Sequence, residues 1–434
     1  MTVINPTPAV RPPKIPSSME IIPIHASDRA NFKRCRRRWE WSSPMRDNLM
    51  PKVEQSGVVM PLWFGSGVHW ALAQYYNPVL KRDPVEAFIW WWDIQMNGGI
   101  LTEEQLDTDR LQVADPNPIQ IDTGKERVWK PEDGYPLPEA DVAYRFRGLY
   151  DLLPNNDFEK FDEHKELGIG MLSFYKEYAE ANDNFAVIVE EHTFSIPVVD
   201  QDGVALLAMD QRDGRVKPVH IRGTQDALIQ ELEFGRFGIL EHKTAARVDE
   251  DYFRKLEKDE QCTTYLYAAE REAALHGLEY EKVSFVLYNA LRKAFPKPPT
   301  ATRDGMFSIN RAQESTTYPM LMDYIDSNGL RVVVDSLEEN DKHFQYIKYV
   351  KESGDKQFIQ RDFVRRNRAE IQSCGERIYM EVMDMLDPKL RIYPNPTGDY
   401  MCLNCPFRAP CIATDDGGDA KMLLVDNYEK AWKK

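Results

Sequence analysis

The sequence predicts an α/β protein in which a central sheet is flanked by helices. β-rich runs separated by Asp and Gly turns follow one another between residues 185 and 244, and a further apolar run covers 282–290. Helical patterns precede these runs at 168–182 and follow them at about 249–275. Strands flanked by helices are typical of a core in which helices cover one sheet, in an α/β or α+β arrangement.

Composition narrows the classes of protein further. With 42% hydrophobic and 29% charged residues, the chain of 434 residues is globular rather than disordered or fibrous. Its 55 basic and 70 acidic side chains give a formal charge of −15, so DNA contact requires a local basic groove. Apolar runs are shorter than the ~18 residues of a membrane span, and the first 20 residues lack an apolar signal segment. We therefore expect a cytoplasmic protein without membrane contact.

Changes in pattern divide the chain into six parts. Prolines are frequent near the N-terminus, whereas Pro, Asp and Gly interrupt the periodicity after residue 98. The expected parts are a flexible Pro-rich arm (1–24), an N-terminal helical part (25–97), an insertion (98–165), the core sheet (166–300), a helical region (301–390) and a Cys-rich tail (391–434).

Two carboxylates and a lysine carry the most specific chemical signal. Glu241 and Lys243 are two residues apart on one strand and therefore share a face. A hairpin with the preceding strand can bring Asp226 beside them. Two carboxylates suit Mg²⁺ or Mn²⁺, and a neighbouring ammonium group can stabilise charge on a phosphate. The set predicts metal-assisted phosphodiester hydrolysis, although cross-strand salt bridges on a surface have the same pattern.

Alternation along the strand that carries Asp226 sorts its side chains into two faces. Four apolar residues fall on one face, namely Val219, Ile221, Ala227 and Ile229. Three polar residues fall on the other, namely Arg222, Thr224 and Asp226.

Four other side chains can extend this site. His69 begins a helical pattern after the glycines of 65–67 and could bind a cation, although an isolated helical histidine is usually solvated or packed. Glu190 ends an apolar strand and could hold a metal-bound water or be an edge charge. Gln261 and Tyr265, at i and i+4, share a helix face and could contact substrate, or form the polar boundary of an amphipathic helix.

In this order, the motifs resemble those of the PD-(D/E)XK nuclease superfamily, most of all its RecB-type branch. That branch includes the iron–sulfur exonucleases of CRISPR adaptation and the AddB nuclease domain. The matching segments are Gly65 to His69, Gly223-x-x-Asp226, Glu241-x-Lys243 and Gln261-x3-Tyr265. The resemblance implies a restriction-endonuclease-like core with a mixed sheet and a helical, iron–sulfur-bound cap.

The resemblance also assigns roles to these residues. His69, Asp226, Glu241 and the backbone carbonyl of His242 would bind Mg²⁺ or Mn²⁺. Lys243 would be the catalytic lysine, and Gln261 and Tyr265 would assist at the substrate.

The cysteines fit the same branch, whose iron–sulfur members use one cysteine before the core and three after it. The corresponding residues are Cys35, Cys402, Cys405 and Cys411, of which the last three have the spacing C-x2-C-x5-C. Four thiolates can hold a [4Fe–4S] cluster or a structural Zn²⁺, and the resemblance favours the cluster. Cys262 and Cys374 are most simply buried, small hydrophobic residues.

Two basic groups are candidates for contact with the DNA backbone. The first surrounds Cys35 and comprises Lys33, Arg34, Arg36, Arg37 and Arg38. The second is expected on a late helix and comprises Arg361, Arg365, Arg366 and Arg368. Candidates for base stacking are Trp39, Trp41 and Tyr75. The alternative for a charge run is a solvated helix face.

These observations predict a divalent-metal-dependent DNA nuclease, an exonuclease on single strands or DNA ends. It would act in recombination, repair or viral DNA processing in a prokaryote or its virus. The alternative is a non-catalytic DNA-binding or assembly module on the same fold. The chain lacks the G-x4-G-K-[ST] loop of a motor, so a helicase or recombination protein would be a separate partner.

Overall fold

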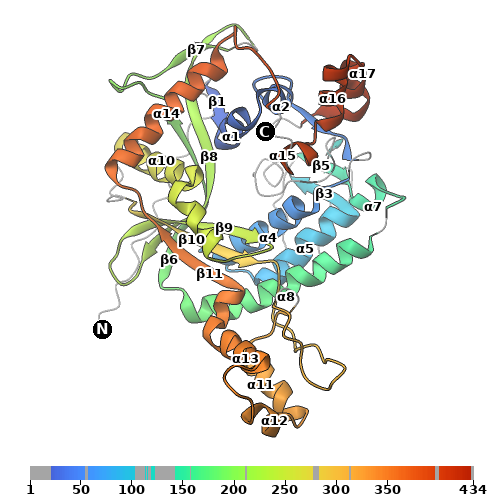
Figure 1. Cartoon of the computed structure of the whole chain (residues 1–434). Coiled ribbons are helices and arrows are strands. Elements are labelled where there is room, and N and C mark those ends of the chain that lie inside the picture. The colour runs from blue at the N-terminus through green and yellow to red at the C-terminus, as the bar shows by residue number, and fades with distance from the viewer. Residues whose placement is uncertain are drawn as a thin grey trace.

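The computed structural model describes residues 21–53, 57–102, 113, 115, 119–122, 142–156, 158–210, 213–276, 283–311, 314–395 and 400–431 (Figure 1). Most of the predicted arm, residues 1–20, lies outside the described residues. As far as the chain is described, none of its helices has both the length and the apolar character that crossing a bilayer requires.

A mixed sheet forms the centre of the molecule, with the strand order β1-β8-β9-β10-β11 and with β6 and β7 also paired to β8. The strands are β1 (Ile22–His25), β6 (Phe185–Pro197), β7 (Leu207–Met209), β8 (Val216–Glu231), β9 (Phe237–Ala245), β10 (Phe285–Arg292) and β11 (Ile359–Val364). β8 is antiparallel to β9, and β9 is parallel to β10. The predicted α/β class with a mixed sheet flanked by helices is confirmed.

The sheet extends beyond the range expected for it. β1 lies at the end of the predicted arm and pairs in parallel with β8, with Ile24 opposite Ile221. β11 lies inside the predicted helical region and is antiparallel to β10. Both strands come from distant parts of the sequence, so only long-range pairing places them here.

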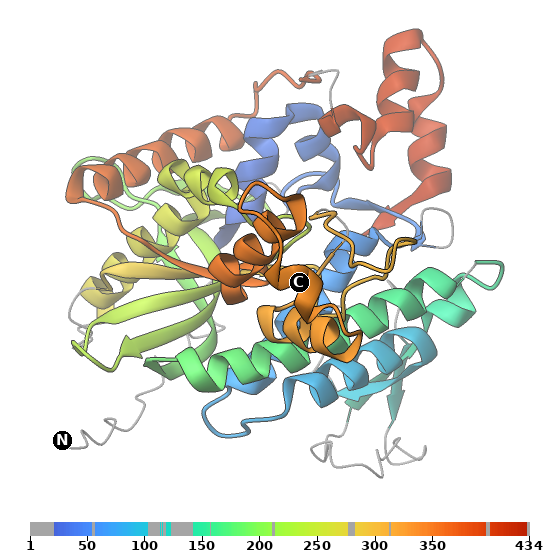
Figure 2. The same ribbon diagram turned by 60° about the horizontal axis from the view of Figure 1, so that its bottom comes forward.

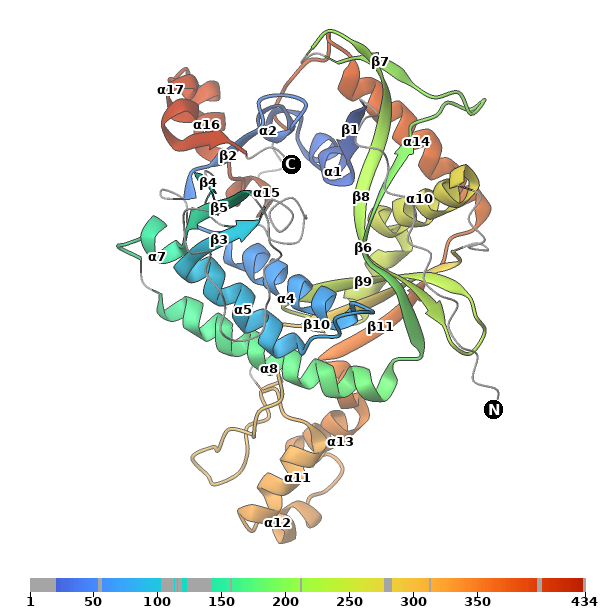
Figure 3. The ribbon, with the colours of Figure 1, turned by 180° about the vertical axis from the view of Figure 1, so that it is seen from behind.

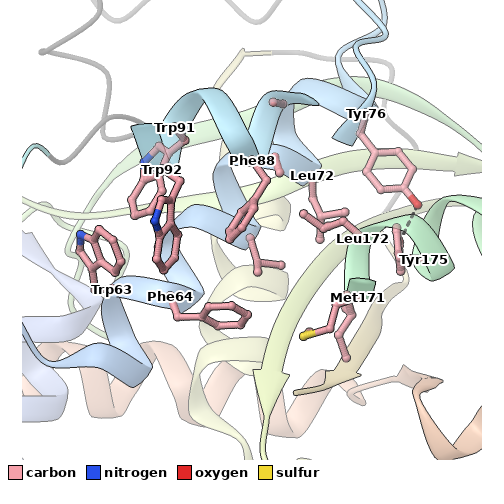
Figure 4. Packing of buried hydrophobic residues seen from close by; sticks show 14 of the residues in the cluster. Trp63, Phe64, Leu72, Tyr76, Phe88, Trp91, Trp92, Met171, Leu172 and Tyr175 are labelled. Atoms are coloured by element: carbon pink, nitrogen blue, oxygen red, sulfur yellow. Dashed lines mark hydrogen bonds between the residues drawn. The ribbon is translucent and has the colours of Figure 1, made fainter. Parts of the chain in front are cut away.

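One face of the sheet packs under α4 (Met60–Tyr76), α5 (Pro84–Asn97) and α8 (Glu159–Asn182). Large aromatic side chains fill this interface, including Trp63, Phe88 and Trp92, which cluster in Figure 4. Trp63 and Trp92 meet edge to face with ring centroids 4.4 Å apart. This packing fixes α4 against the end of β9, where the site lies.

The other face packs under α1 (Ala26–Arg34), α10 (Glu260–His276) and α14 (Arg368–Leu386) (Figure 3). The continuous helix expected at about 249–275 is interrupted. It forms α9 (Glu250–Arg254), a 3₁₀ turn (Lys255–Lys258) and α10. Asp259 ends the interruption, because its carboxylate accepts a hydrogen bond of 2.7 Å from the Cys262 N–H in the first turn of α10.

β8 contributes to both apolar clusters. Val219 and Ile221 pack under α10 and α14, whereas Ala227 and Ile229 pack under α4 and α8. The prediction that all four share a face is therefore wrong. The side chain of Gln225 still faces α10, because its Nε2 donates to the Tyr265 carbonyl at 3.4 Å. The change of face therefore falls next to Asp226, where β6 carries Glu191 with a φ of 49° between the Glu190–Ala227 and His192–Gln225 pairs.

Two smaller units adjoin this core. In the predicted insertion, β3 (Gly98–Thr102), β4 (Ile119–Asp122) and β5 (Val142–Arg147) form a three-stranded sheet followed by α7 (Leu149–Leu152). In the helical region, α11 (Tyr318–Ser327), α12 (Arg331–Asp335) and α13 (Lys342–Ser353) enclose an apolar cluster of their own, and a 3₁₀ turn (Gly354–Gln357) follows them. Figure 2 shows α11–α13 in front of the body of the molecule.

The C-terminal tail returns to the N-terminal part. It comprises α15 (Tyr400–Leu403), α16 (Arg408–Asp416), α17 (Ala420–Asn427) and β12 (Tyr428–Lys430), which meet α2 (Arg36–Ser42) and β2 (Leu49–Pro51). β12 pairs antiparallel with β2, with Tyr428 opposite Pro51. Phe407 stacks on Tyr428 and packs against Trp41.

Candidate active site

Strand pairing brings the two predicted carboxylates together. Ala227 of β8 lies opposite Leu240 of β9, which places Asp226 beside Glu241. The His242 N–H donates a hydrogen bond of 2.6 Å to Asp226 Oδ2. Lys243 lies on the same side of β9 as Glu241, and its ammonium group contacts Glu241 Oε1. The three side chains converge at the end of the paired strands.

His69 reaches this group from α4. Its Nδ1 lies 3.3 Å from Asp226 Oδ1. The predicted glycine turn before His69 is wrong, because α4 already begins at Met60 and carries the glycines inside it. Those glycines permit close packing: a Cβ on Gly67 would lie 2.7 Å from the Trp91 ring. The missing side chain therefore lets α4 pack closely against α5.

Gln261 and Tyr265 approach from the opposite side, on α10. Gln261 Nε2 donates to Glu241 Oε1 at 2.9 Å, and also lies 2.7 Å from the Tyr265 hydroxyl. Tyr265 in turn donates to the Thr224 carbonyl at 2.7 Å and is buried. Tyr265 thus holds α10 to β8, and Gln261 orients one oxygen of Glu241.

Burial controls the charges of this group. Burial raises the pKa of Glu241 to about 7, despite the opposing effect of Lys243. Burial acts to raise the pKa of Asp226 too, but His69 outweighs it and holds that pKa below its usual value. Burial acts to lower the pKa of Lys243, but the carboxylates of Glu241 and Asp226 raise it. At neutral pH, Asp226 and Lys243 are therefore ionised and Glu241 is poised to lose its proton.

The donor set fits a hard divalent cation. Glu241 is 1% exposed, and its Oε2 is buried without a hydrogen-bond partner among the described residues. A buried, unpaired carboxylate oxygen is costly unless a cation or another donor satisfies it. Within the described ranges, His, Cys, Asp and Glu side chains form no group of three or more already spaced as metal ligands. At the candidate site, Lys243 and Gln261 contact the Glu241 carboxylate directly, and the His242 N–H contacts the Asp226 carboxylate.

Comparison with known families shows which superfamily the chain belongs to. A sequence model of the PD-(D/E)XK nuclease superfamily matches residues 25–412. The chain belongs to the PD-(D/E)XK nuclease superfamily. A comparison with curated proteins finds no match. The predicted superfamily is confirmed, and with it a nuclease fold whose members act on DNA, generally with Mg²⁺ or Mn²⁺.

Behind the candidate active site lies a buried polar network that sequence reasoning missed. Asn289 of β10 is opposite His242, and its Nδ2 lies 2.7 Å from His242 Nδ1. Arg361 of β11 donates to Asn289 Oδ1 at 3.0 Å and forms an ion pair of 2.6 Å with Asp183. Burial lowers the pKa of His242 to about 3, so its ring is neutral. The sequence signal available for this network was a polar residue within the apolar run at 282–290.

The second basic group does not lie on one helix. Arg361 is on β11, Arg365 and Arg366 follow that strand, and only Arg368 begins α14. Arg361 is largely buried against Asp183, and Arg366 donates to the Thr263 hydroxyl and the Leu256 carbonyl. Arg365 and Arg368 are exposed. The expectation of a basic helix face is wrong, because tertiary contacts take up two of the four guanidinium groups.

The first basic group is also partly engaged within the protein. Lys33 forms ion pairs with carboxylates of α10 and α14, and Arg37 pairs with Asp415 at 2.8 Å. Arg36 stacks on the Tyr393 ring. Arg34 is exposed, and Arg38 is half-buried. Their role in DNA contact stays a prediction.

The aromatic residues proposed for base stacking differ in exposure. Trp39 is completely buried, so it is excluded as a stacking platform. Trp41 and Tyr75 are only partly buried.

Glu190 lies on β6 and accepts a hydrogen bond of 2.8 Å from Asn77, at the end of α4.

The predicted cysteine ligands lie where the tail meets the N-terminal part. None of the six cysteines, all of which lie in the described ranges, forms a disulfide bond. The Asn395 N–H donates to Cys35 Sγ, and Arg37 donates to Cys411 Sγ, each at 3.4 Å. Cys35 and Cys411 are both close enough to Cys405 to affect its pKa, which burial raises. Cys262 and Cys374 are buried in the core, as their isolated positions suggest.

Proposed function

We propose that this PD-(D/E)XK protein is a divalent-metal-dependent DNA exonuclease of the RecB-type branch, acting on single strands or DNA ends. The convergence of Asp226, Glu241 and Lys243 at the end of paired strands carries the proposal. His69 and Gln261 complete the motif order of that branch. The buried, unpaired Oε2 of Glu241 supports a cation at this place.

In this proposal, His69, Asp226, Glu241 and the backbone carbonyl of His242 hold Mg²⁺ or Mn²⁺. Such a cation polarises a phosphoryl oxygen and lowers the pKa of a bound water. The protein supplies the rest. Lys243 keeps its positive charge and is 31% exposed, so its ammonium group can meet negative charge developing on a phosphate.

The test compares two lysines with similar exposure. Lys243→Met removes the proposed catalytic charge, whereas Lys176→Met removes a lysine of α8 that pairs with Asp83 and is 39% exposed. We expect Lys243→Met to lower cleavage of end-labelled DNA by about 100-fold or more while DNA binding persists. Lys176→Met should retain activity. Full activity in Lys243→Met would eliminate the proposed site.

Substrate topology separates the finer alternatives. An exonuclease degrades linear single strands but spares circular ones, whereas an endonuclease opens both. The non-catalytic alternative predicts DNA binding that weakens with salt and no cleavage with Mg²⁺ or Mn²⁺. The setting in recombination, repair or viral DNA processing, and a separate helicase partner, stay predictions.

We further propose that Cys35, Cys402, Cys405 and Cys411 hold a [4Fe–4S] cluster, with Zn²⁺ as the rival occupant. N–H donors to Cys35 and Cys411 support this, since such donors tune thiolate-bound clusters. Anaerobically purified protein should contain about four iron and four sulfide per chain. Cys35→Ala should lose this iron, and Cys374→Ala should keep it. Stoichiometric zinc without iron would refute the cluster.

A further inference from the structure

Helix α1 rests on the N-terminal turns of α10, the helix that carries Gln261. Arg29 of α1 has a side chain that is only 4% exposed, and it forms an ion pair of 2.7 Å with Glu381 of α14. Its NH1 also donates to the Thr264 hydroxyl of α10 at 3.4 Å. Arg29 therefore fixes α1 to both helices through contacts inside the protein.

Lys33 lies one turn further along α1 and continues this set of contacts. Its ammonium group contacts the carboxylate of Glu260 and lies 3.2 Å from Glu381 Oε1. Although burial acts to raise the pKa of Glu260, Lys33 and then Arg29 outweigh it and lower that pKa. Lys33 is thus ion-paired with the carboxylates of Glu260 and Glu381.

The position of Glu260 gives these contacts a link to the active site. Glu260 is the first residue of α10, and the next residue, Gln261, donates to Glu241 Oε1 at 2.9 Å. A hydrogen bond weakens steeply when its length or angle changes by a fraction of an ångström or a few tens of degrees. The placement of this first turn therefore determines how Glu241 is oriented.

We propose that Lys33 is a positioning residue, which holds the first turn of α10 through Glu260 so that Gln261 orients Glu241. The inference rests on the proposed nuclease function and replaces the interpretation of Lys33 as a phosphate contact. Arg29 and Glu381 support the same helix from its buried side.

The test uses Lys33 because its side chain is 32% exposed and should tolerate substitution. The Arg29 side chain is only 4% exposed, and its loss would remove both the ion pair with Glu381 and the hydrogen bond to Thr264 from the interior. The variants are Lys33→Met, Glu260→Gln, the double variant and Lys33→Arg. Lys348→Met is the control, since Lys348 forms an exposed i,i+4 pair with Glu352 on α13. Each is assayed for kcat and KM on end-labelled DNA, and for DNA affinity at several salt concentrations.

We expect Lys33→Met to lower kcat about 5-fold, with KM and the salt dependence of binding unchanged. The double variant should be no slower than the single ones, because both remove one contact, and Lys33→Arg should stay within about two-fold of wild type. Weaker DNA binding with a salt slope reduced by about one would instead show a phosphate contact and overturn the proposal. Unchanged kcat in Lys33→Met would overturn it as well.

Hydrogen exchange of the α10 amides gives a readout that does not need activity. Lys33→Met should speed exchange in the first turns of α10, and Lys348→Met should not. If the wild-type protein cleaves no DNA, the proposed function fails, and this exchange measurement alone decides whether Lys33 fixes α10. Unchanged exchange would then overturn the inference.

Discussion

Arg361 provides the sharpest test of how the core supports the site. The sequence placed it among DNA-contacting residues, but the structure places its guanidinium against Asp183 at 2.6 Å, with side chains 11% and 18% exposed. It also donates to Asn289 Oδ1 at 3.0 Å and to the Tyr175 hydroxyl at 3.1 Å. The perturbation is Arg361→Met, which keeps most of the side-chain length and removes the charge.

The expected cost follows from what remains buried. Removing one partner of a buried ion pair costs about 3–5 kcal/mol, because the other charge is left uncompensated. Tyr76 still donates to Asp183 Oδ2 at 2.8 Å, which favours the lower end, about 3 kcal/mol. Adding Asp183→Asn to Arg361→Met removes the carboxylate charge that would otherwise be left without its partner. The double variant should therefore recover about 2 kcal/mol relative to the sum of the single changes.

Urea unfolding of the four proteins measures this coupling, and its pH dependence gives a second check. Burial already raises the pKa of Asp183, and the loss of Arg361 raises it further. A carboxyl whose pKa is higher in the folded than in the unfolded protein stabilises the fold more as pH falls. The loss of unfolding free energy in Arg361→Met, relative to wild type, should therefore become smaller as the pH is lowered. The salt slope of DNA binding should not change. The reasoning would be refuted if each single change lowered the free energy of unfolding by less than about 1 kcal/mol and the two losses simply added in the double variant. A smaller salt slope of DNA binding in Arg361→Met would also refute it.

Two further outcomes follow from the site. If Glu241 binds the proposed cation, protons compete with the cation for this carboxylate, because its pKa is raised to about 7. The Mn²⁺ affinity measured by calorimetry should then rise between about pH 6 and about pH 8. A flat pH profile, or the same slope in Glu241→Gln, would contradict this. Gly67→Ala should lower the free energy of unfolding by about 1–3 kcal/mol, since its Cβ would lie 2.7 Å from the Trp91 ring. Gly65→Ala, whose Cβ would be 3.4 Å from Thr244 Oγ1, is the matched control, and equal losses would argue against close packing as the cause.

Some features of the site depend on short-range geometry and could be predicted from the sequence. Glu241 and Lys243 share a face because side chains alternate along a strand. Gln261 and Tyr265 share a helix face because residues four apart are neighbours, and their hydrogen bond follows from that spacing. The superfamily too could be identified from the order of such motifs.

Other expectations failed where a distant contact decided the outcome. Arg361 and Arg366 belong to a basic run in the sequence, yet ion pairing and hydrogen bonds to remote segments bury or engage both. The alternation of β8 failed next to Asp226, where the paired strand β6 carries Glu191 with a positive φ of 49°, and the β8 sequence cannot show an irregularity in its partner. Trp39 is fully buried for the same kind of reason, since packing against other helices covers it.

The fold class, the superfamily and the candidate chemical groups could all be predicted before folding was considered, since they depend on residue type and on spacings within single strands and helices. Three contacts could be found only in the folded protein: His69 reaches Asp226, Arg361 holds Asn289 behind the site, and Lys33 faces Glu260. Burial and charge pairing join segments that lie far apart in the chain, and such contacts leave no periodic signal in the sequence.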